Sequence, residues 1–543
     1  MIVSVILDTE YAGALNRSKW FLKSVSNAHK EDILIVTHAG LKKNIREIIE
    51  GCSERFFGEF EMEHVSEADI EKLDICFIPD FMFDELYESC GSRSKQLNYL
   101  FNNRVPKIEE FVISYIDSAL KRRGINKPAF IMNCLHTFAF VKHLSEHYNC
   151  ALIPYVFSAI RKVHGYSQTL YMAHLDQNLF NSAACQKMVN SMHAADLGFP
   201  ILSRKEVLAL LGKKHNMPLL PLLERKGIYE TGVLGEGYHI TPEVYQFDSV
   251  TDDDIYYECN RYYDPRKIIT RQHPMQLDQV GIGREHMKND PAAFLLSCNR
   301  VVTVQSQAII KAAIWNRVAV AMSNALPYAC LLSRDVTDAD PISDYNLNFI
   351  LFAYFVPDSC MFSLEYWLWR MTEPPVHEIA NRHISTIFQS LNIPLEVLLE
   401  QKERLPDILK YRGLSNWDIS NALGADNTND VPYDYPTSYL RYYAEDGRGE
   451  SVFCLNRLYN GRIRSAFSLP KESARWELVL QNDLDGFITV STLKIDKRIV
   501  DLNIQNKYCR KNEPIIFFEK ETAKAQQVEV DWLVKRADKF AIE

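Results

Sequence analysis

Short apolar runs alternate with amphipathic helical segments through the first part of the chain. The runs are of strand length, and they cover residues 2–7, 33–38, 75–78, 129–134 and 151–156. The segments between them, such as residues 108–122, carry apolar side chains at helical spacing. This alternation predicts a Rossmann-like α/β domain, a parallel sheet with helices on both faces. No GxGxxG motif follows the first strand, so the fingerprint of a dinucleotide site is absent.

A second series of the same kind begins after a Gly-rich passage, residues 230–248, which we interpret as a hinge. Residues 205–227, just before it, are predicted to be helical. The second series has apolar runs at residues 244–247, 267–270, 301–304 and 318–322, and it predicts a second Rossmann-like domain. Between the first two runs, Asp252, Asp253 and Asp254 open a predicted helix, 252–262. Acidic residues suit the positive end of a helix, which favours capping over a metal–nucleotide site.

The pattern changes twice more towards the C-terminus. Residues 345–390 are helical and aromatic with interruptions at Pro357 and Pro374, and we expect 348–357 to be a buried helix. Beyond a polar, turn-rich linker, apolar residues alternate with period two, which predicts an all-β sandwich module. The expected divisions are an N-terminal domain 1–235, a second domain 236–345, a helical arm 346–422 that packs back on both domains, a linker 423–437 and a β-sandwich module 438–543.

Composition narrows the class of protein. The 543 residues are 47% hydrophobic and 24% charged, which is typical of a globular protein with large cores, and the net charge of −9 offers no basic footprint for nucleic acid. The 12 cysteines are scattered without a CxxC pair and predict reduced thiols, hence a cytoplasmic protein. The apolar start lacks the basic lead of a signal peptide, and residues 348–357 are too short to span a bilayer.

Two polar turns follow neighbouring apolar runs of the second domain. Arg271, His273 and Pro274 follow the run 267–270, and the triplet Gln305, Ser306 and Gln307 follows the run 301–304. In open parallel sheets, ligands bind at the carboxyl ends of the strands. The second turn opens a predicted helix, 307–315, whose first N–H groups would favour an anion.

Within these turns, Ser306 would cap the helix and donate its hydroxyl to a phosphate, while His273 and Arg271 would supply an imidazole and a cation. Each turn alone is also typical of an ordinary cap or reverse turn. Together they predict a phosphate site.

The sequence around both turns, IITRQHP followed by VVTVQSQAIIKAAIWNRVAVAMS, resembles the nucleotide-binding half of bacterial capsule and O-antigen glycosyltransferases. Among them it is most similar to the CMP-Kdo-dependent β-Kdo transferases and related GT-B enzymes. The resemblance implies two Rossmann-like domains that face a cleft, with the donor phosphate held by His273 and by Gln305, Ser306 and Gln307. It also implies that the β module is a fused accessory domain.

As to substrates, the resemblance implies transfer of Kdo or another ulosonic acid from a CMP-linked donor onto a lipid-linked glycan. The enzyme would use no metal or other cofactor and would associate peripherally with the inner membrane. The family's Gly-Phe-Glu-Ala helix start reads Ile309, Ile310, Lys311 and Ala312 here. A UDP or GDP donor, which usually recruits an additional cation such as Arg271, Arg284 or Lys311, therefore remains an alternative.

Glycosyl transfer also needs a carboxylate that acts as base or nucleophile. Asp248, after the predicted strand 244–247, and Glu236, in the Gly-flanked turn, are our candidates. On the acceptor side the candidates are Asp8 and Glu10 after the first strand, and Arg161 and His164 in the segment 158–180.

Segment 158–180 is equally compatible with a solvated hairpin. Two other functions also remain open for the chain as a whole. It could be a non-catalytic carbohydrate-binding or scaffold component, or a two-domain sugar-nucleotide epimerase.

Overall fold

The structure is a computed structural model of the chain. It describes residues 1–536 except 8–13, 29, 44, 51, 53–56, 59, 92, 135–137, 163–165, 176–181, 192–200, 213–225, 228, 236–249, 251, 265–266, 272–290, 406–436, 444–448, 456–461, 469–474, 482–485, 496–497, 501–506, 510–513 and 520–526. The chain forms two compact units. Unit 1 comprises Met1–Met217, Thr241–Phe247 and Ser343–Gly413, and unit 2 comprises Pro218–Ile240, Asp248–Ile342 and Leu414–Glu543.

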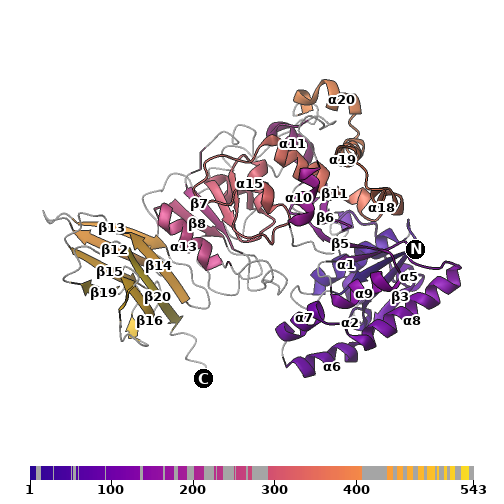
Figure 1. Cartoon of the computed structure of the whole chain (residues 1–543), viewed down its shortest axis with the longest axis horizontal. Coiled ribbons are helices and arrows are strands. Elements are labelled where there is room, and N and C mark those ends of the chain that lie inside the picture. The colour runs from indigo at the N-terminus through magenta and orange to yellow at the C-terminus, as the bar shows by residue number, and fades with distance from the viewer. Residues whose placement is uncertain are drawn as a thin grey trace. The chain divides into compact units, whose positions relative to one another are not determined.

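Unit 1 is built on a seven-stranded sheet with the order β11-β6-β5-β4-β1-β2-β3 (Figure 1). Its strands are β1 (Ile2–Ile6), β2 (Ile33–His38), β3 (Ile75–Ile78), β4 (Phe130–Cys134), β5 (Ala151–Phe157), β6 (Leu170–Ala173) and β11 (Phe355–Pro357). Strands β1 to β5 are parallel, while β6 runs antiparallel to both β5 and β11. The five apolar runs expected to be strands are confirmed.

Helices cover both faces of this sheet, as predicted. They are α1 (Ala14–Asn27), α2 (Ala39–Lys43), α3 (Ile45–Glu50), α5 (Glu67–Glu71), α6 (Asp80–Cys90), α7 (Arg93–Asn102), α8 (Pro106–Arg123), α9 (Ala139–His147), α10 (Ala183–Asn190) and α11 (Arg204–Leu211). Val3 and Val5 of β1 belong to one buried cluster with residues of α7, α8 and α9. Ser4 faces the other way, and its hydroxyl lies 3.0 Å from that of Ser24 on α1. The helix expected over 205–227 ends at Leu211.

The predicted helical arm contains a strand. Its elements are α16 (Asp344–Asn348), the π-helix η8 (Phe349–Tyr354), β11, α17 (Asp358–Met361), α18 (Leu364–Arg370), α19 (Val376–Ser390), α20 (Leu395–Glu400) and the 3-10 helix η9 (Lys402–Arg404). The expectation of one buried helix over 348–357 is therefore wrong from Phe355 onward. Val356 favours extended backbone, and Pro357, which has no N–H to donate, ends the outermost strand of the sheet.

A buried ion pair ties the arm to the body of unit 1. The ammonium of Lys23, on α1, lies 2.7 Å from the Asp358 carboxylate, and Lys23 is only 1% exposed. The Tyr171 hydroxyl donates to the same carboxylate over 2.7 Å. Lys23 also donates to the carbonyl oxygens of Phe60 and Glu61 at 3.1 and 2.9 Å. The ammonium is thus fully bonded although it is out of contact with water.

A second buried polar chain joins α18, α19 and η8. Arg370 donates to the Tyr366 hydroxyl over 2.8 Å, and that hydroxyl lies 2.7 Å from Nε2 of His383. Nδ1 of His383 lies 2.9 Å from the Phe352 carbonyl, which can only accept, so Nδ1 carries the hydrogen and Nε2 accepts from Tyr366. Burial, assisted by the Arg370 charge, lowers the pKa of His383 to about 3.

Unit 2 begins with a four-stranded, all-parallel sheet of order β10-β9-β7-β8. Its strands are β7 (Tyr229–Leu234), β8 (Ile268–Arg271), β9 (Cys298–Thr303) and β10 (Val318–Ala321), and its helices are α13 (Asp252–Tyr262), α14 (Pro291–Ser297), α15 (Ile309–Ile314) and the 3-10 helix η7 (Ala329–Leu331). The predicted helix 252–262 is confirmed. The expected strand 244–247 lies outside the described residues.

Strand β7 corrects the interpretation of residues 230–248 as a hinge. The first part of that passage is a central strand, paired with both β8 and β9. Gly232 is required for close packing there rather than for bending. A Cβ at this position would lie 2.5 Å from Sγ of Cys298 and 2.9 Å from the ring of Phe294, on α14. This passage belongs to unit 2 as far as Ile240.

The C-terminal part of unit 2 forms two antiparallel sheets, β13-β12-β15-β19 and β14-β20-β16-β17, with β18 paired to β16. The strands are β12 (Thr437–Tyr443), β13 (Gly449–Leu455), β14 (Arg462–Ser468), β15 (Arg475–Gln481), β16 (Gly486–Ile495), β17 (Arg498–Val500), β18 (Lys507–Cys509), β19 (Pro514–Glu519) and β20 (Gln527–Arg536). Buried residues of both sheets, including Trp476 and Trp532, join Val233 and Ile255 of the α/β part in one hydrophobic cluster. The module therefore shares its core with the parallel sheet.

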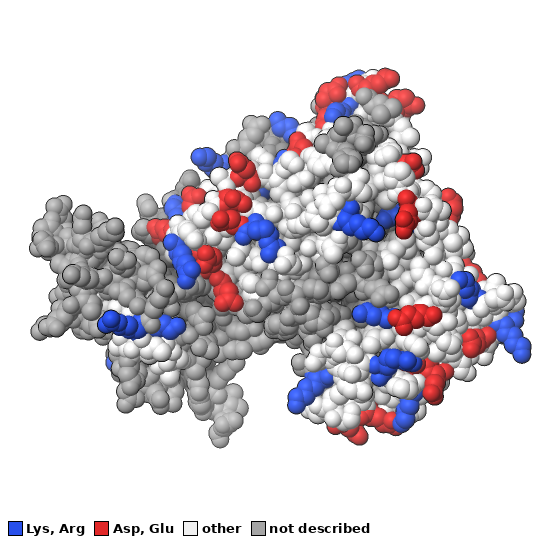
Figure 2. Space-filling view, viewed as in Figure 1, with Lys and Arg blue, Asp and Glu red and all other residues white. Residues whose placement is uncertain are grey.

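Three general features complete the fold. The cysteines whose side chains are described are all free thiols. None of the helices in the described ranges combines the length and apolar content needed to cross a membrane. On the described part of the face in Figure 2, basic and acidic side chains are interspersed.

The Lys23–Asp358 pair generates a stability prediction. Replacing one partner leaves the other charge buried and unpaired, so we expect Lys23→Met or Asp358→Asn to lower the free energy of unfolding by about 3–5 kcal/mol. Lys30→Met is the matched control, because the Lys30–Glu63 pair is 63% and 57% exposed and such pairs contribute about 1 kcal/mol or less. Urea unfolding measures all three. An equal, small loss in all three variants would contradict the assignment.

The buried histidines predict a pH dependence. His174, whose ring lies 4.2 Å from that of Tyr354, also has its pKa lowered to about 3, by burial and then by Arg370. Because these folded pKa values lie below the ordinary 6.5, the unfolded chain binds more protons between pH 6.5 and 3, and stability falls as the pH is lowered through that window. Each histidine contributes a slope of up to about 1.4 kcal/mol per pH unit.

We therefore expect His174→Phe to flatten the dependence of the urea midpoint on pH. The substitution keeps an aromatic ring at this position, and it removes Nε2, which is buried without a hydrogen-bond partner among the described residues. His143→Phe, at a partly exposed position, should leave most of the dependence in place. An unchanged slope in His174→Phe would contradict the prediction.

Candidate functional site

The strand order of the second parallel sheet reverses at β7. From β7 the chain passes to β8 on one side, and it then returns to β9 and β10 on the other side. The connections that follow β7 and β9 therefore leave the carboxyl edge in opposite directions. In open α/β sheets this is the position at which ligands bind. The candidate site is the edge where β7 and β9 end.

A single hydroxyl links the strand ends to the turn that follows β9. Leu234 of β7 is level with Thr303 of β9, whose side chain is fully buried. The Thr303 hydroxyl donates to the Leu234 carbonyl over 3.1 Å and accepts from the Ser306 amide over 3.0 Å. It therefore satisfies a carbonyl of one strand and an amide of the turn at once. This fixes the position of the turn relative to β7.

The predicted phosphate-binding turn, Gln305 to Gln307, is half-buried at this edge. The Ser306 side chain makes no hydrogen bond to any residue that the structure describes. Oε1 of Gln307 is buried and likewise has no partner among the described residues. Such a buried amide oxygen is costly unless a donor reaches it. Both groups fit a ligand that carries donors and acceptors.

The expected capping role of Ser306 is wrong. Helix α15 spans Ile309–Ile314 rather than 307–315, and its N-cap is Ala308, without a side-chain hydrogen bond. The Ile309 amide donates to the Ser306 carbonyl over 3.1 Å, so Ser306 lies in the turn that precedes the helix. The Ser306 amide donates to the Thr303 hydroxyl, and this bond holds the turn that precedes α15.

Arg271 lies at the same edge. It is the last residue of β8, it is level with Leu234, and it is buried at 7% exposure. Its carbonyl accepts from the Gly235 amide over 2.8 Å. Arg271 and Thr303 thus occupy the two strands that flank β7, at the same level. Lys311, the other described candidate cation, is buried in α15.

The other candidates of this half fall outside the described residues. These are Glu236, Asp248, His273, Pro274 and Arg284. Their roles stay predictions.

Unit 1 has a comparable edge where β1, β4 and β5 end. Its strand order reverses between β1 and β4, and Asp8 and Glu10 follow β1 in the sequence. Asp8, Glu10 and His164 lie outside the described residues.

Arg161 is described, and it follows β5. Its Nε donates to the Ser158 carbonyl over 2.6 Å, and its Cζ lies 5.1 Å from the ring centroid of Phe157, the last residue of β5. Burial lowers the pKa of this guanidinium to about 10, so it stays charged at neutral pH. Strand β6, further along the same segment, runs antiparallel to β5.

Sequence reasoning missed Lys19 at this edge. Its ammonium lies 5.7 Å from the Phe157 ring centroid, so two cations flank one aromatic ring. The sequence pattern gives no signal for Lys19, since a lysine in an amphipathic helix usually lies on the solvent-exposed face.

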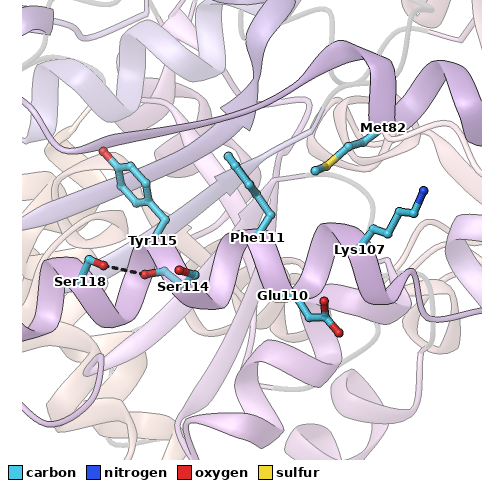
Figure 3. A pocket seen from close by; sticks show the side chains of 7 residues that line it. All are labelled: Met82, Lys107, Glu110, Phe111, Ser114, Tyr115 and Ser118. Carbon is cyan, nitrogen blue, oxygen red and sulfur yellow. Dashed lines mark hydrogen bonds between the residues drawn. The ribbon is translucent and has the colours of Figure 1, made fainter.

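A pocket on unit 1 is a different feature. Its volume is about 510 Å³, and it is lined by Met82 of α6 and by Lys107, Glu110, Phe111, Ser114, Tyr115 and Ser118 of α8 (Figure 3). Figure 3 shows the Lys107 and Glu110 side chains pointing in different directions. Lys107 pairs with Glu85 over 2.9 Å. The pocket lies along a helix rather than at a carboxyl edge, and it includes none of the predicted site residues.

No protein-family model matches the chain, and no curated protein sequence matches it. Solved structures similar to it include the β-Kdo 2,4-transferase KpsC of Thermosulfurimonas dismutans, at 12% identity and a TM-score of 0.29, over 40% of this chain and 78% of the other. The Methanocaldococcus jannaschii UDP-GlcNAc 2-epimerase, in complex with UDP-GlcNAc and UDP, has 11% identity and a TM-score of 0.26, over 65% and 98%. S. aureus MnaA with UDP has 9% identity and a TM-score of 0.27, over 72% and 97%. Since these TM-scores are below 0.5, the functional proposal rests on the residues of this chain.

Proposed function

We propose that the chain is a glycosyltransferase that takes a sugar from a nucleotide donor. The leading donor is CMP-linked Kdo or another ulosonic acid, and the acceptor is a growing lipid-linked surface polysaccharide or oligosaccharide. One observation carries the proposal. The turn Gln305 to Gln307, expected to bind phosphate, emerges where the strand order reverses, and it is held there by Thr303.

The donor phosphate would bind at this turn. The Ser306 hydroxyl, which makes no hydrogen bond to a described residue, would donate to a phosphate oxygen, and the Gln307 amide would contact the nucleotide. The Arg271 charge lies at the same edge, and His273, two residues further on, would add an imidazole. A CMP donor has a single phosphate, whose charge a hydroxyl, an imidazole and an arginine can stabilise. We therefore propose a metal-independent reaction.

The catalytic carboxylate would come from a loop at the same edge. Glu236 follows β7 by two residues in the sequence and is the first candidate. Asp248 is the second candidate. Either would deprotonate the acceptor hydroxyl or form a covalent adduct while the phosphate leaves.

The acceptor would bind to the GT-B partner domain, unit 1. There Arg161, His164, Asp8 and Glu10 are the proposed contacts. Peripheral association with the inner membrane would bring the enzyme to a lipid-linked acceptor.

Nucleotide affinity and reaction products distinguish this proposal from its alternatives. A UDP- or GDP-dependent transferase would bind those nucleotides more tightly than CMP. An epimerase would convert a UDP-sugar without an acceptor. A carbohydrate-binding component would turn over no nucleotide sugar at all.

Nucleotide binding provides the first test. We expect the full chain to bind CMP in isothermal titration, and Ser306→Ala and His273→Ala to weaken binding about 10- to 100-fold each, since a hydrogen bond to a charged group contributes about 1.5–3 kcal/mol. Ser89→Ala, which removes an exposed hydroxyl bonded to its own helix in unit 1, is the control and should change nothing. Absence of binding by CMP, UDP and GDP alike, or equal affinity in Ser306→Ala and wild type, would overturn the proposal.

A further inference from the structure

Two of the described cations at the carboxyl edge of unit 1 pair with acids. Lys23 pairs with Asp358, as described above. Lys162 pairs with Glu61, which also accepts from the Thr169 amide over 3.0 Å. Thr169 connects the two pairs, because its carbonyl accepts from the Asp358 amide over 3.0 Å. The two lysines and two carboxylates therefore neutralise one another, so neither carboxylate is free to neutralise a further cation.

Arg161 is that further cation. Its ion pairs and hydrogen bonds to described residues amount to one contact, from Nε to the Ser158 carbonyl. This contact and the Phe157 ring beneath fix the plane of the guanidinium. Nη1 and Nη2, the two-pronged end of the group, make no hydrogen bond or ion pair to any described residue, and Arg161 is only partly buried. A half-buried, immobilised guanidinium without a carboxylate costs free energy that a ligand can offset.

We propose that Arg161 is an oxyanion-binding residue that recognises a carboxylate or phosphate group of the acceptor through Nη1 and Nη2. Two parallel N–H···O bonds from a fixed, planar fork match either oxyanion. Lys19, on the same Phe157 ring, adds positive charge. The assignment of this anion to the acceptor rests on the proposed function, whereas the anion site itself does not.

The test measures how tightly the full chain binds charged and neutral sugars that share one hexose ring. Glucuronate carries a carboxylate, glucose 6-phosphate carries a phosphate, and glucose is neutral. Trp20, whose ring stacks on Phe157 at 3.9 Å, provides a fluorescence signal close to the site. We expect one or both acids to bind at least tenfold more tightly than glucose, and the tighter of the two identifies the anion.

Arg161→Gln should weaken binding of that acid about tenfold or more, since a charge-assisted pair is lost. Arg161→Lys should recover part of it, because the charge remains without the fork. Arg382→Gln is the matched control. Arg382 also stacks on an aromatic ring, at 4.6 Å from Trp369, but it has an acid partner, Glu365, so this substitution should not affect acid binding.

Two results would overturn the inference, namely acids that bind no better than glucose, or acids that bind Arg161→Gln or Arg161→Lys as tightly as wild type. Ser306→Ala separates the two proposals. If acid binding depends on Arg161 while no nucleotide binds, the anion site stands and the proposed function fails. If nucleotide binding depends on Ser306 while acid binding does not depend on Arg161, the proposed function stands and the anion site fails.

Discussion

The reversal of strand order at β7 is the constraint on which the candidate site depends. Because β8 and β9 lie on opposite sides of β7, the loops that follow β7 and β9 diverge at one edge. Close packing of β7 makes this possible, since only glycine at position 232 leaves room for Cys298 and Phe294. The Thr303 hydroxyl then fixes the turn before α15 against the end of β7. A backbone arrangement thus positions Ser306 and Gln307 before any ligand is present.

The sheet of unit 1 also reverses its strand order, but it has additional strands on one side. Its parallel strands reverse between β1 and β4, and the far side of the sheet is extended by β6 and β11. Strand β11 comes from a segment distant in sequence, and the Lys23–Asp358 pair holds that segment to α1. Placing Asp358 and Glu61 opposite Lys23 and Lys162 leaves Arg161 as a cation without an acid partner among the described residues. Structural charges and the proposed binding charge are therefore adjacent but distinct.

Sequence reasoning succeeded where local patterns and tertiary structure agree. Helix α8 and the first five strands have strong periodicity and were predicted within one or two residues. The sequence does not predict strand β7, because glycine in a Gly-rich passage indicates a flexible hinge. The structure shows instead that Gly232 lets β7 pack closely against Cys298 and Phe294, which only tertiary packing reveals. Ser306 was read as a cap because the Thr303 hydroxyl, which holds its amide, is not part of any local capping pattern.

Two further differences have the same origin. In the β module, the register of β16 shifts between Val490 and Thr492, which interrupts within one strand the period-two alternation expected there. That Arg161 has no acid partner among the described residues was not predictable either, since it depends on which lysines pair with acids.

The shared core of unit 2 joins the β module to the β7–β10 sheet, so the module is not an independent appendage. The central claim is that a nucleotide phosphate binds where β9 ends. The most direct measurement is a crystal structure of the full chain with CMP. The phosphate is predicted to contact the Ser306 hydroxyl at the carboxyl edge of the β7–β10 sheet. A phosphate bound elsewhere, on the β module or at the α8 pocket, would contradict the claim.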